Sequence, residues 1–194
     1  IGMPVIGFPT PWADTEDEYF RRGLEVQEKF SGQPLVGISF VPHAPYSVGD
    51  DAFRRIAQLA EELDIVVHLH LLEAPGEIES SRKEHGLHPL DRMESLGLLG
   101  PRLLAVHMTQ ITDADIPRLA RAGVHVVHCP DSNMKLASGI CPVAALDAAG
   151  VNVCIGTDGA ASNNDLSLLA EMRQTALLAK VSSGDPEAIP AARA

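Results

Sequence analysis

Six short apolar runs, separated by longer segments of mixed polarity, constrain the fold of this chain more than any other feature of its sequence. Most of the runs are nearly continuous in hydrophobicity and show little alternation of apolar and polar residues. Strands that are buried on both faces, as in parallel sheets, have this pattern. We therefore predict six strands, at residues 3–8, 35–41, 64–71, 102–108, 124–129 and 151–157.

Segments with the apolar spacing of helices lie between these runs. Thr112 is placed to cap a helix that ends at Gly123. Pro142 suits the first turn of another helix, which ends at Gly150. The alternation of strands and helices indicates βα units and a parallel sheet. The predicted helices cover residues 14–30, 50–63, 112–123, 142–150 and 165–181.

Two α/β architectures fit this alternation: an open, doubly wound sheet, and part of an eight-stranded (β/α)8 barrel, the TIM barrel. A complete barrel takes about 250 residues, whereas this chain has 194. Polar residues at the carboxyl ends of four different predicted strands decide between them. A barrel gathers such ends around one mouth, where its active site lies, whereas an open sheet spreads them along a line. We therefore predict one domain over residues 1–194 that is part of a barrel. The four residues are His43, His70, His107 and Asp158.

The charge balance of the chain argues against nucleic acid as a partner. The formal net charge is −11, and an acidic surface repels the phosphate backbone. No apolar run approaches the roughly 20 residues that span a bilayer, and the first residues lack the pattern of a signal peptide. The three cysteines, without CxxC spacing, favour reduced thiols. The sequence therefore predicts a cytoplasmic protein without a membrane partner.

The third apolar run ends in the segment HLHLLE, which carries two histidines and a glutamate. Residues 68 and 70 of a strand point to the same side, and Glu73, in the following loop, can face the same pocket. Core histidines and a solvated glutamate are the alternative interpretation. We adopt that interpretation for His68, which lies deeper in the strand, and a functional one for His70 and Glu73.

Similar residues end three other predicted strands. An aspartate such as Asp158 at the end of a buried strand is costly unless it is paired or bound to metal, although an Asx-turn or a helix N-cap is an alternative. His107 ends the run RLLAVH, and its position, equivalent to that of His70, favours function over a core role. His43 lies between two prolines that stiffen its loop.

Histidine and aspartate on separate strands suit zinc or iron(II), which bind imidazole and carboxylate and acidify bound water. A glutamate beside such a metal is the usual proton shuttle. Polar residues after the fifth run could line the same mouth, namely His128, Asp131, Ser132 and Asn133. Three histidines without partners in the pattern are expected to be structural or at the surface, namely His85, His88 and His125.

Four segments together resemble the amidohydrolase superfamily: HLHLLE, LLAVHMTQ, HCPDSNMKLASGICPV and GTDGAASNNDLSLLAEMR. Within it, the chain is similar to the 5-methylthioadenosine/S-adenosylhomocysteine deaminases and the related chlorohydrolase-like enzymes. The segments PHAPYS and EVQEKF fit as well. The resemblance covers essentially the whole chain. It implies a (β/α)8 TIM barrel of the metal-dependent hydrolase type, with a small β-sandwich built from both chain ends.

The resemblance also implies a role for each residue at a strand end. His70 and Asp158 match metal ligands on strands 5 and 8 of the barrel, and Asp158 also accepts a proton from water. Glu73 matches a catalytic glutamate that contacts the substrate. His107 matches a catalytic histidine beside the metal-bound water, and His43 a histidine that contacts the substrate. The family metal is one divalent ion, zinc or alternatively iron.

One ligand pair of the family pattern has no match. An HxH on strand 1 should precede this segment, and no residues here supply it; His68 and His70 form an HxH on a different strand. We therefore expect residues 1–194 to hold about strands 3–8 of the barrel, without the strand-1/2 region and the β-sandwich.

The reaction that the resemblance implies is hydrolytic deamination of an aminopurine, with release of ammonia. Its substrates are adenosine-type nucleosides such as 5-methylthioadenosine and S-adenosylhomocysteine. Guanine deamination and triazine or chlorohydrolase chemistry use the same residues and stay as alternatives, and a non-catalytic barrel-type binding module is the alternative from another class. The expected partner is a small nucleoside or aromatic-ring substrate, and a homo-oligomer is left open.

Overall fold

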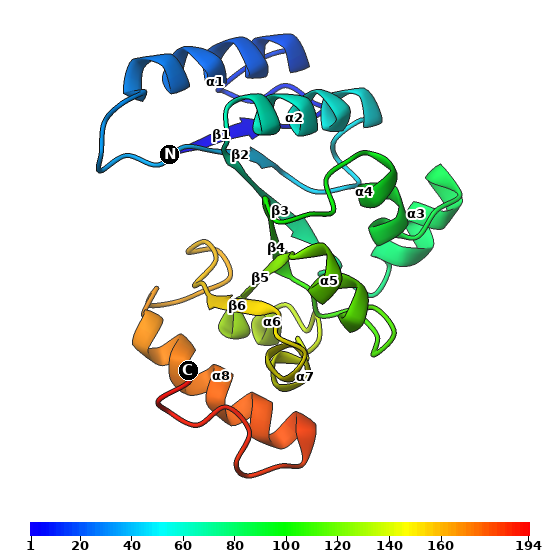
Figure 1. Cartoon of the computed structure of the whole chain (residues 1–194), viewed down its shortest axis with the longest axis vertical. Helices are drawn as coiled ribbons and strands as arrows, with labels where there is room; N and C mark the ends of the chain where they lie inside the picture. Colours follow the sequence, from blue (N-terminus) through cyan, green and yellow to red (C-terminus); the bar gives the residue numbers. More distant parts are fainter. The chain divides into compact units, whose positions relative to one another are not determined.

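Strands and helices alternate along the whole chain. The computed structural model describes residues 1–194, and Figure 1 shows its elements in chain order. The strands are β1 (Gly2–Val5), β2 (Ser39–Pro42), β3 (Val66–Leu71), β4 (Leu103–His107), β5 (His125–His128) and β6 (Asn152–Ile155). The helices are α1 (Glu16–Phe30), α2 (Asp50–Glu62), α3 (Glu77–His85), α4 (Pro89–Ser95), α5 (Ile116–Ala122), α6 (Pro130–Lys135), α7 (Val143–Ala148) and α8 (Leu168–Ser183).

The order of strands in the sheet follows the chain, β1-β2-β3-β4-β5-β6. The pairs β1–β2, β2–β3 and β5–β6 are parallel. A doubly wound sheet reverses its strand order at a switch point, whereas each barrel strand is followed by its helix and then by the next strand. The observed order therefore favours barrel strands over an open sheet. Because β1 and β6 stand at the ends of this order, each has a strand neighbour on one side only.

The chain divides into two compact units. The first unit comprises Ile1–His70 and Glu79–Leu104, and the second comprises Leu71–Ile78 and Ala105–Ala194. No helix has the length and apolar composition needed to cross a membrane.

In the first unit, α1 packs closely against the strands β1 and β2. The helix begins after Thr15, whose hydroxyl accepts a hydrogen bond from the backbone of the first turn. Phe20 contacts Phe40 of β2, with the ring centroids 6.1 Å apart. A Cβ atom added at Gly23 would lie 3.1 Å from Cβ of Met3, so the missing side chain lets the helix approach β1.

In the second unit, short helices cover strands whose buried side chains are aliphatic. Leu119 of α5, Val126 of β5 and Leu146 of α7 are fully buried. The helix α5 ends at Gly123, whose φ of 72° lies in the left-handed region that favours glycine. This end confirms the predicted stop of the helix.

All six predicted strands are present, but several predicted boundaries are wrong, among them the start of β2 and the cap of α5. Strand β2 does not begin at residue 35, because Leu35 is 97% exposed and the Val36 N–H donates to the carbonyl of Gln33 in a turn. Thr112 does not cap α5. Its N–H and hydroxyl both donate to the Asp115 carboxylate at 2.8 Å, so Thr112 belongs to the turn before the helix.

Candidate active site

In the first unit, the His70 ring has one nitrogen fixed by the backbone. Its Nδ1 lies 2.6 Å from the carbonyl oxygen of His43. Because a carbonyl oxygen only accepts, Nδ1 carries the proton, and in the neutral ring Nε2 keeps its lone pair. A metal-binding histidine needs a tautomer fixed in this way. His68 lies half-buried on the same side of β3, with its ring centroid 6.5 Å from that of His70.

His43 follows β2 in the loop that sequence reasoning singled out. Its Nδ1 lies 2.8 Å from Oγ of Ser47, and its ring centroid lies 5.9 Å from that of Tyr46. Burial, and to a lesser degree the neighbouring His70, lower the pKa of His43, so its ring is neutral at pH 7. These contacts orient the ring within the loop.

Arg92 of α4 anchors this loop, although the sequence did not mark it as a functional residue. Its guanidinium donates to the carbonyl oxygens of Pro45 and Val48, at 2.5 and 3.1 Å. Its Nε donates to the carboxylate of Asp50 at 2.8 Å. The side chain is almost fully buried, so these contacts satisfy a charge that water does not reach.

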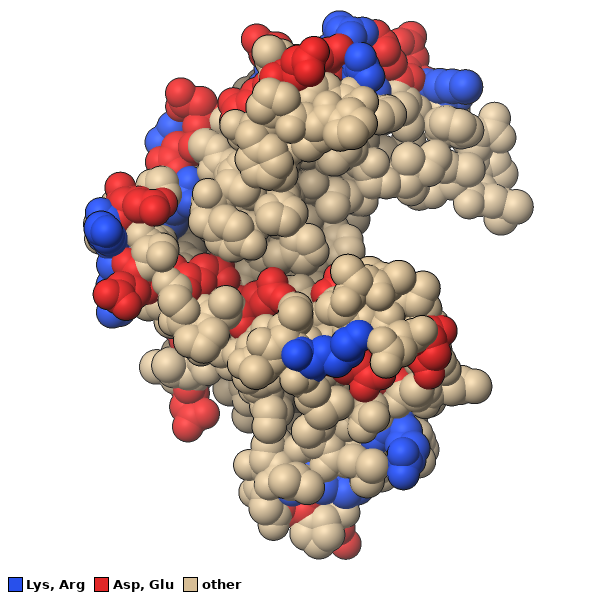
Figure 2. All heavy atoms as spheres, turned by 180° about the vertical axis from the view of Figure 1, so that it is seen from behind, with Lys and Arg blue, Asp and Glu red and all other residues tan.

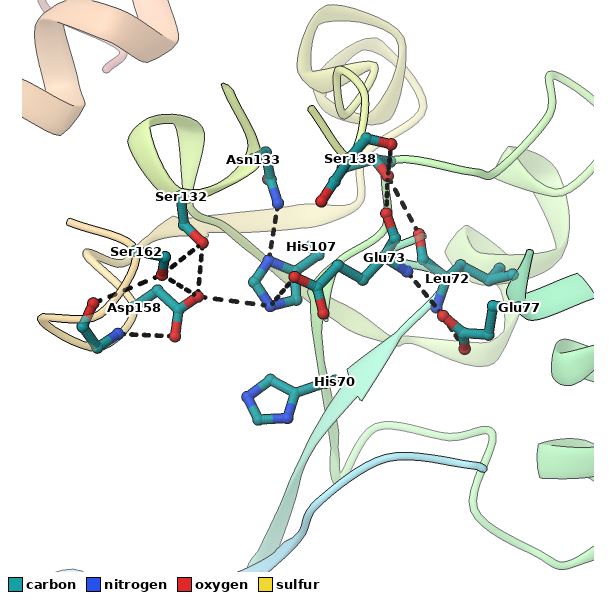
Figure 3. A network of polar contacts seen from close by, with 12 residues as sticks. His70, Leu72, Glu73, Glu77, His107, Ser132, Asn133, Ser138, Asp158 and Ser162 are labelled. Carbon is teal, nitrogen blue, oxygen red and sulfur yellow. Dashed lines mark hydrogen bonds and ion pairs between the residues drawn. The ribbon is translucent and has the colours of Figure 1, made fainter. Parts of the chain in front are cut away.

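In the second unit, three side chains from different strand ends converge (Figure 3). One ligand atom from each of Glu73, His107 and Asp158 lies within 4.8 Å of the other two. The Nε2 atom of His107 is 3.7 Å from Oε1 of Glu73 and 3.9 Å from Oδ2 of Asp158. These separations exceed hydrogen-bonding distance, and three such groups could hold one small ion or water molecule among them.

Asp158 lies in the loop after β6, with a backbone φ of 58° in the left-handed region. Its Oδ2 accepts from the hydroxyls of Ser132 and Ser162 at 2.6 and 3.1 Å, and its Oδ1 accepts from the Gly159 N–H at 2.7 Å. Burial by itself raises the pKa of Asp158, but these hydrogen bonds together outweigh burial and hold the pKa below its usual value. The carboxylate is therefore ionised at neutral pH, the form that binds a cation.

His107, which is almost fully buried, ends β4 with a backbone φ of 78°. The side-chain nitrogen of Asn133 lies 3.0 Å from its Nδ1. An amide nitrogen only donates, so Nδ1 accepts and the ring proton lies on Nε2, toward the two carboxylates. The Nε2–H of His107 can therefore donate a hydrogen bond to an acceptor that lies between it and the two carboxylates.

The residues after β5 have different roles. Ser132 and Asn133 contact site residues, as expected for residues that line the mouth. His128 is instead buried, and neither of its ring nitrogens has a hydrogen-bond partner. Burial, with a smaller effect of His107, lowers the pKa of His128 to about 4, so it is neutral. His88 has a structural role, since its Nδ1 accepts from the backbone N–H of Leu90 at the start of α4.

Glu171 of α8 is a second residue that sequence reasoning missed. Its carboxylate is fully buried and accepts from the side chain of Asn163 and, at 3.2 Å, from the N–H of Asp131. Asn163 also donates to the carbonyl of Thr157 at 3.0 Å. Glu171 thereby ties the loop that carries Asp158 to the start of α6. The sequence offered one signal for this residue, because Glu171 lies among apolar residues of the helix predicted at 165–181.

The donors suit a divalent ion such as zinc. His70 offers an imidazole Nε2 with a fixed tautomer, and Asp158 offers an ionised carboxylate. Zinc binds both kinds of group at about 2.0–2.2 Å.

Comparison with known proteins identifies the family of the chain. The family model described as the amidohydrolase family matches residues 12–194. The chain is 52% identical over 189 residues to a 5-methylthioadenosine/S-adenosylhomocysteine deaminase of Teredinibacter turnerae, covering 97% of this chain and 43% of that protein. It is 43% identical to a 5'-deoxyadenosine deaminase of Methanothermobacter thermautotrophicus, covering 80% of this chain and 36% of that protein. The chain thus spans less than half the length of these relatives.

Solved structures extend the comparison to the fold. An adenosine deaminase from Xanthomonas campestris with bound zinc matches 99% of this chain and 44% of its own, with a TM-score of 0.96 and 51% identity. A guanine deaminase from C. acetobutylicum matches with a TM-score of 0.85 at 23% identity, over 99% of this chain and 48% of its own, which shows a shared fold alone. Together with the parallel strands in chain order, these matches confirm the predicted partial barrel. The chain belongs to the amidohydrolase family.

Proposed function

We propose that residues 1–194 form the larger part of the catalytic barrel of a metal-dependent hydrolytic deaminase of adenosine-type nucleosides. The observation that carries the proposal is the convergence of Glu73, His107 and Asp158, whose ligand atoms lie within 4.8 Å of one another. Two carboxylates and a histidine N–H are the groups that such a hydrolysis needs to move protons. The names of the relatives support 5-methylthioadenosine and S-adenosylhomocysteine as substrates.

His70 and Asp158 would hold one divalent ion, with zinc favoured over iron. The fixed tautomer of His70, the low pKa of Asp158 and the zinc bound in the Xanthomonas campestris relative support this choice. We further propose that the remaining ligands are an HxH pair on a strand outside residues 1–194. Bound there, the ion would lower the pKa of a water molecule toward neutrality.

The side chains of this chain would then divide the proton transfers among them. Asp158 accepts a proton from the attacking water on its carboxylate. The Nε2–H of His107 donates a hydrogen bond to the water oxygen and orients it. Glu73 gives a proton to the ring nitrogen beside the amino-bearing carbon, and that carbon becomes more electrophilic. The proton taken up by Asp158 passes to the amino group of the resulting tetrahedral carbon, and the hydroxyl proton returns to Glu73 as ammonia leaves. Adenine thus becomes hypoxanthine on the intact nucleoside.

His43 and its loop would contact the sugar or its substituent. The reacting atoms all belong to the purine ring, so selectivity among nucleosides depends on contacts elsewhere in the substrate. His43 is neutral and lies beside the exposed ring of Tyr46, which suits contact with an uncharged part of a ligand. The net charge of −11 supports a small-molecule substrate rather than nucleic acid, and Figure 2 shows Lys and Arg interspersed with Asp and Glu on the face that it draws. We also propose that the protein is cytoplasmic.

Product release by the zinc-loaded, full-length gene product tests the proposal, with ammonia measured for the nucleosides and bases and chloride for the triazine. The panel contains 5-methylthioadenosine, S-adenosylhomocysteine, adenosine, adenine, guanine, cytosine and a chlorotriazine. We expect kcat/KM for the two thio-nucleosides to exceed that for the free bases, because sugar-side contacts contribute to transition-state binding. Preference for guanine or the triazine would replace the substrate and keep the family chemistry. A metal-free protein that turns over none of them would support a binding module instead.

A further inference from the structure

The peptide groups on both sides of Glu73 are held by side chains that the proposed reaction does not use. The N–H of Glu73 donates to Oε2 of Glu77 at 2.9 Å, as Figure 3 shows. The carbonyl oxygen of Glu73 accepts from the hydroxyl of Thr109 at 2.6 Å. All three residues belong to the second unit. A loop residue held in this way has a restricted backbone, and therefore a restricted direction for its side chain.

Glu77 is the first residue of α3, and its carboxylate turns back toward the end of β3. Its Oε1 accepts from the N–H of Leu72 at 2.9 Å, so the two carboxylate oxygens hold two successive N–H groups. Glu77 is only 7% exposed. Because buried N–H groups need a partner, no other acceptor could take over this role without rearrangement of the loop.

The bend that Glu77 stabilises is an unfavourable one. Leu72 has a φ of 51°, in the left-handed region that residues other than glycine rarely adopt. This bend changes the direction of the chain after β3 and so determines the position of the Glu73 backbone. Strained residues of this kind persist where surrounding contacts fix them.

Thr109 holds the other side of Glu73 from the end of β4, two residues beyond His107. Its hydroxyl oxygen is 2.6 Å from the Glu73 carbonyl and 3.2 Å from the Ser138 carbonyl, and it accepts from the side chain of Gln110 at 3.0 Å. A hydroxyl has one proton, and the shortest contact marks where it points. The strand that presents His107 therefore also fixes Glu73.

We infer that Glu77 and Thr109 are positioning residues, which aim the Glu73 carboxylate at the reacting ring. This inference rests on the proposed role of Glu73 as the proton carrier. It assigns to both residues an effect on the rate of the chemical step and none on metal content. It also requires that their effect disappears when Glu73 cannot carry a proton.

The first experiment replaces Glu77 by glutamine in the zinc-loaded, full-length protein. Glutamine has a single acceptor oxygen, so one of the two N–H groups would face an NH2 group. We expect kcat to fall about 10- to 100-fold, as for a misplaced catalytic group, with KM and zinc content unchanged. In the Glu73→Gln background, the same replacement should have no further effect. An equal loss in both backgrounds would overturn the inference.

The second experiment compares two replacements of Thr109. Thr109→Val removes the hydroxyl and keeps the shape, whereas Thr109→Ser keeps the hydroxyl. We expect the valine variant to lose kcat and the serine variant to retain it, and equal losses in both would count against a positioning role. Glu18→Gln is the matched control for Glu77→Gln. Glu18 also accepts a backbone N–H, that of Asp14 at 2.9 Å, but it lies in the first unit. It should leave kcat unchanged.

A third measurement is independent of activity. Hydrogen exchange of the Leu72 and Glu73 amides should be faster in the Glu77→Gln variant, because their acceptor is altered; unchanged exchange would contradict the contact itself. Full activity of Glu73→Gln would refute the proposed function whatever the exchange result. An inactive Glu73→Gln, combined with wild-type kcat in Glu77→Gln and Thr109→Val, would refute this inference alone.

Discussion

His70 and His107 are fixed in opposite tautomers by their neighbours. A backbone carbonyl accepts from Nδ1 of His70, whereas an amide nitrogen of Asn133 donates to Nδ1 of His107. The first ring is left with a lone pair on Nε2 and the second with a proton on Nε2. This difference agrees with the roles proposed for the two histidines, which are a metal ligand for His70 and a hydrogen-bond donor for His107.

The replacement Glu73→Gln tests the proton carrier directly. Glutamine keeps the size of the side chain but has no transferable carboxyl proton. General acid–base groups contribute about 10²- to 10⁴-fold, and kcat of the full-length protein should fall by that order. Zinc content should stay near that of the wild type. Activity that survives within a few-fold would show that Glu73 does not carry the proton.

The replacement His43→Ala tests the contact with the sugar side. If His43 contacts that part of the nucleoside, its loss should lower kcat/KM for the thio-nucleosides more than for free adenine. The measurement is ammonia release from both substrate types by wild type and variant. Equal losses on every substrate would place His43 with the metal chemistry, through its carbonyl contact to His70.

His128 should make stability depend on pH. Its pKa is about 4 in the folded protein against 6.5 as the reference, so below pH 6.5 the unfolded state binds the extra proton and stability falls as pH decreases. The loss is complete below about pH 4 and amounts to about 3 kcal/mol. Urea unfolding of wild type and His128→Leu at pH 7 and pH 4 measures it. The variant should lose less stability than wild type over this range; equal losses would count against a neutral, buried His128.

At the scale of elements, the sequence predicted the strands and the ends that carry the site. Continuous apolar runs mark strands buried on both faces, and His107 and Asp158 each follow such a run. Their convergence in the second unit follows from strand position, since the ends of parallel strands lie at one edge of a sheet. The roles proposed for His107 and Asp158, like those of His43 and Glu73, come from the family resemblance.

Three helices and the residues that support the site could not be predicted in this way. The helices α3, α4 and α6 have six to nine residues, too short for a clear amphipathic period. The partners of Arg92 lie 42 to 47 residues away in the chain, and no local pattern encodes such contacts. Glu77 has its partners four and five residues away, but the bend that brings them together depends on a left-handed Leu72.

The replacement Arg92→Met tests the anchor of the loop that follows β2. It would leave two carbonyl groups without their buried donor and would remove the shorter of the two ion pairs of Asp50, which also lies 3.9 Å from Arg54. We expect the free energy of unfolding to fall by about 2–4 kcal/mol. Water reaches the Asp50 side chain, which is 40% exposed, and therefore weakens the contribution of the ion pair. Urea denaturation of the full-length protein measures the change.

Arg54→Met is the control for this prediction. Arg54 pairs with Asp51 at 2.7 Å on the surface of α2, where both side chains are largely exposed, and lies 3.9 Å from Asp50. Such a pair contributes about 0–1 kcal/mol, so its loss should be small. Equal effects of the two replacements would show that burial of Arg92 does not govern the stability of the loop.

At the scale of the whole molecule, metal binding should depend on residues beyond this chain. Residues 1–194 supply two proposed zinc ligands, His70 and Asp158, whereas catalytic zinc sites use three protein ligands or more. A polypeptide of these residues alone should therefore bind zinc weakly, and the full-length product should hold about one ion per chain. Metal analysis after gel filtration compares the two. Tight stoichiometric zinc in the shorter polypeptide would mean that His68 or His43 completes the site.

The strand order has a consequence for how this polypeptide behaves when it is produced by itself. Strands β1 and β6 have a strand neighbour on one side only, and the side chains of β6 are partly exposed. Backbone groups along such edges can template the addition of a strand from another molecule. Concentration, rather than temperature alone, would then limit handling of the polypeptide, since edge-to-edge self-association competes with the folded monomer. Charged residues introduced along β6 would slow that association by repulsion between edges.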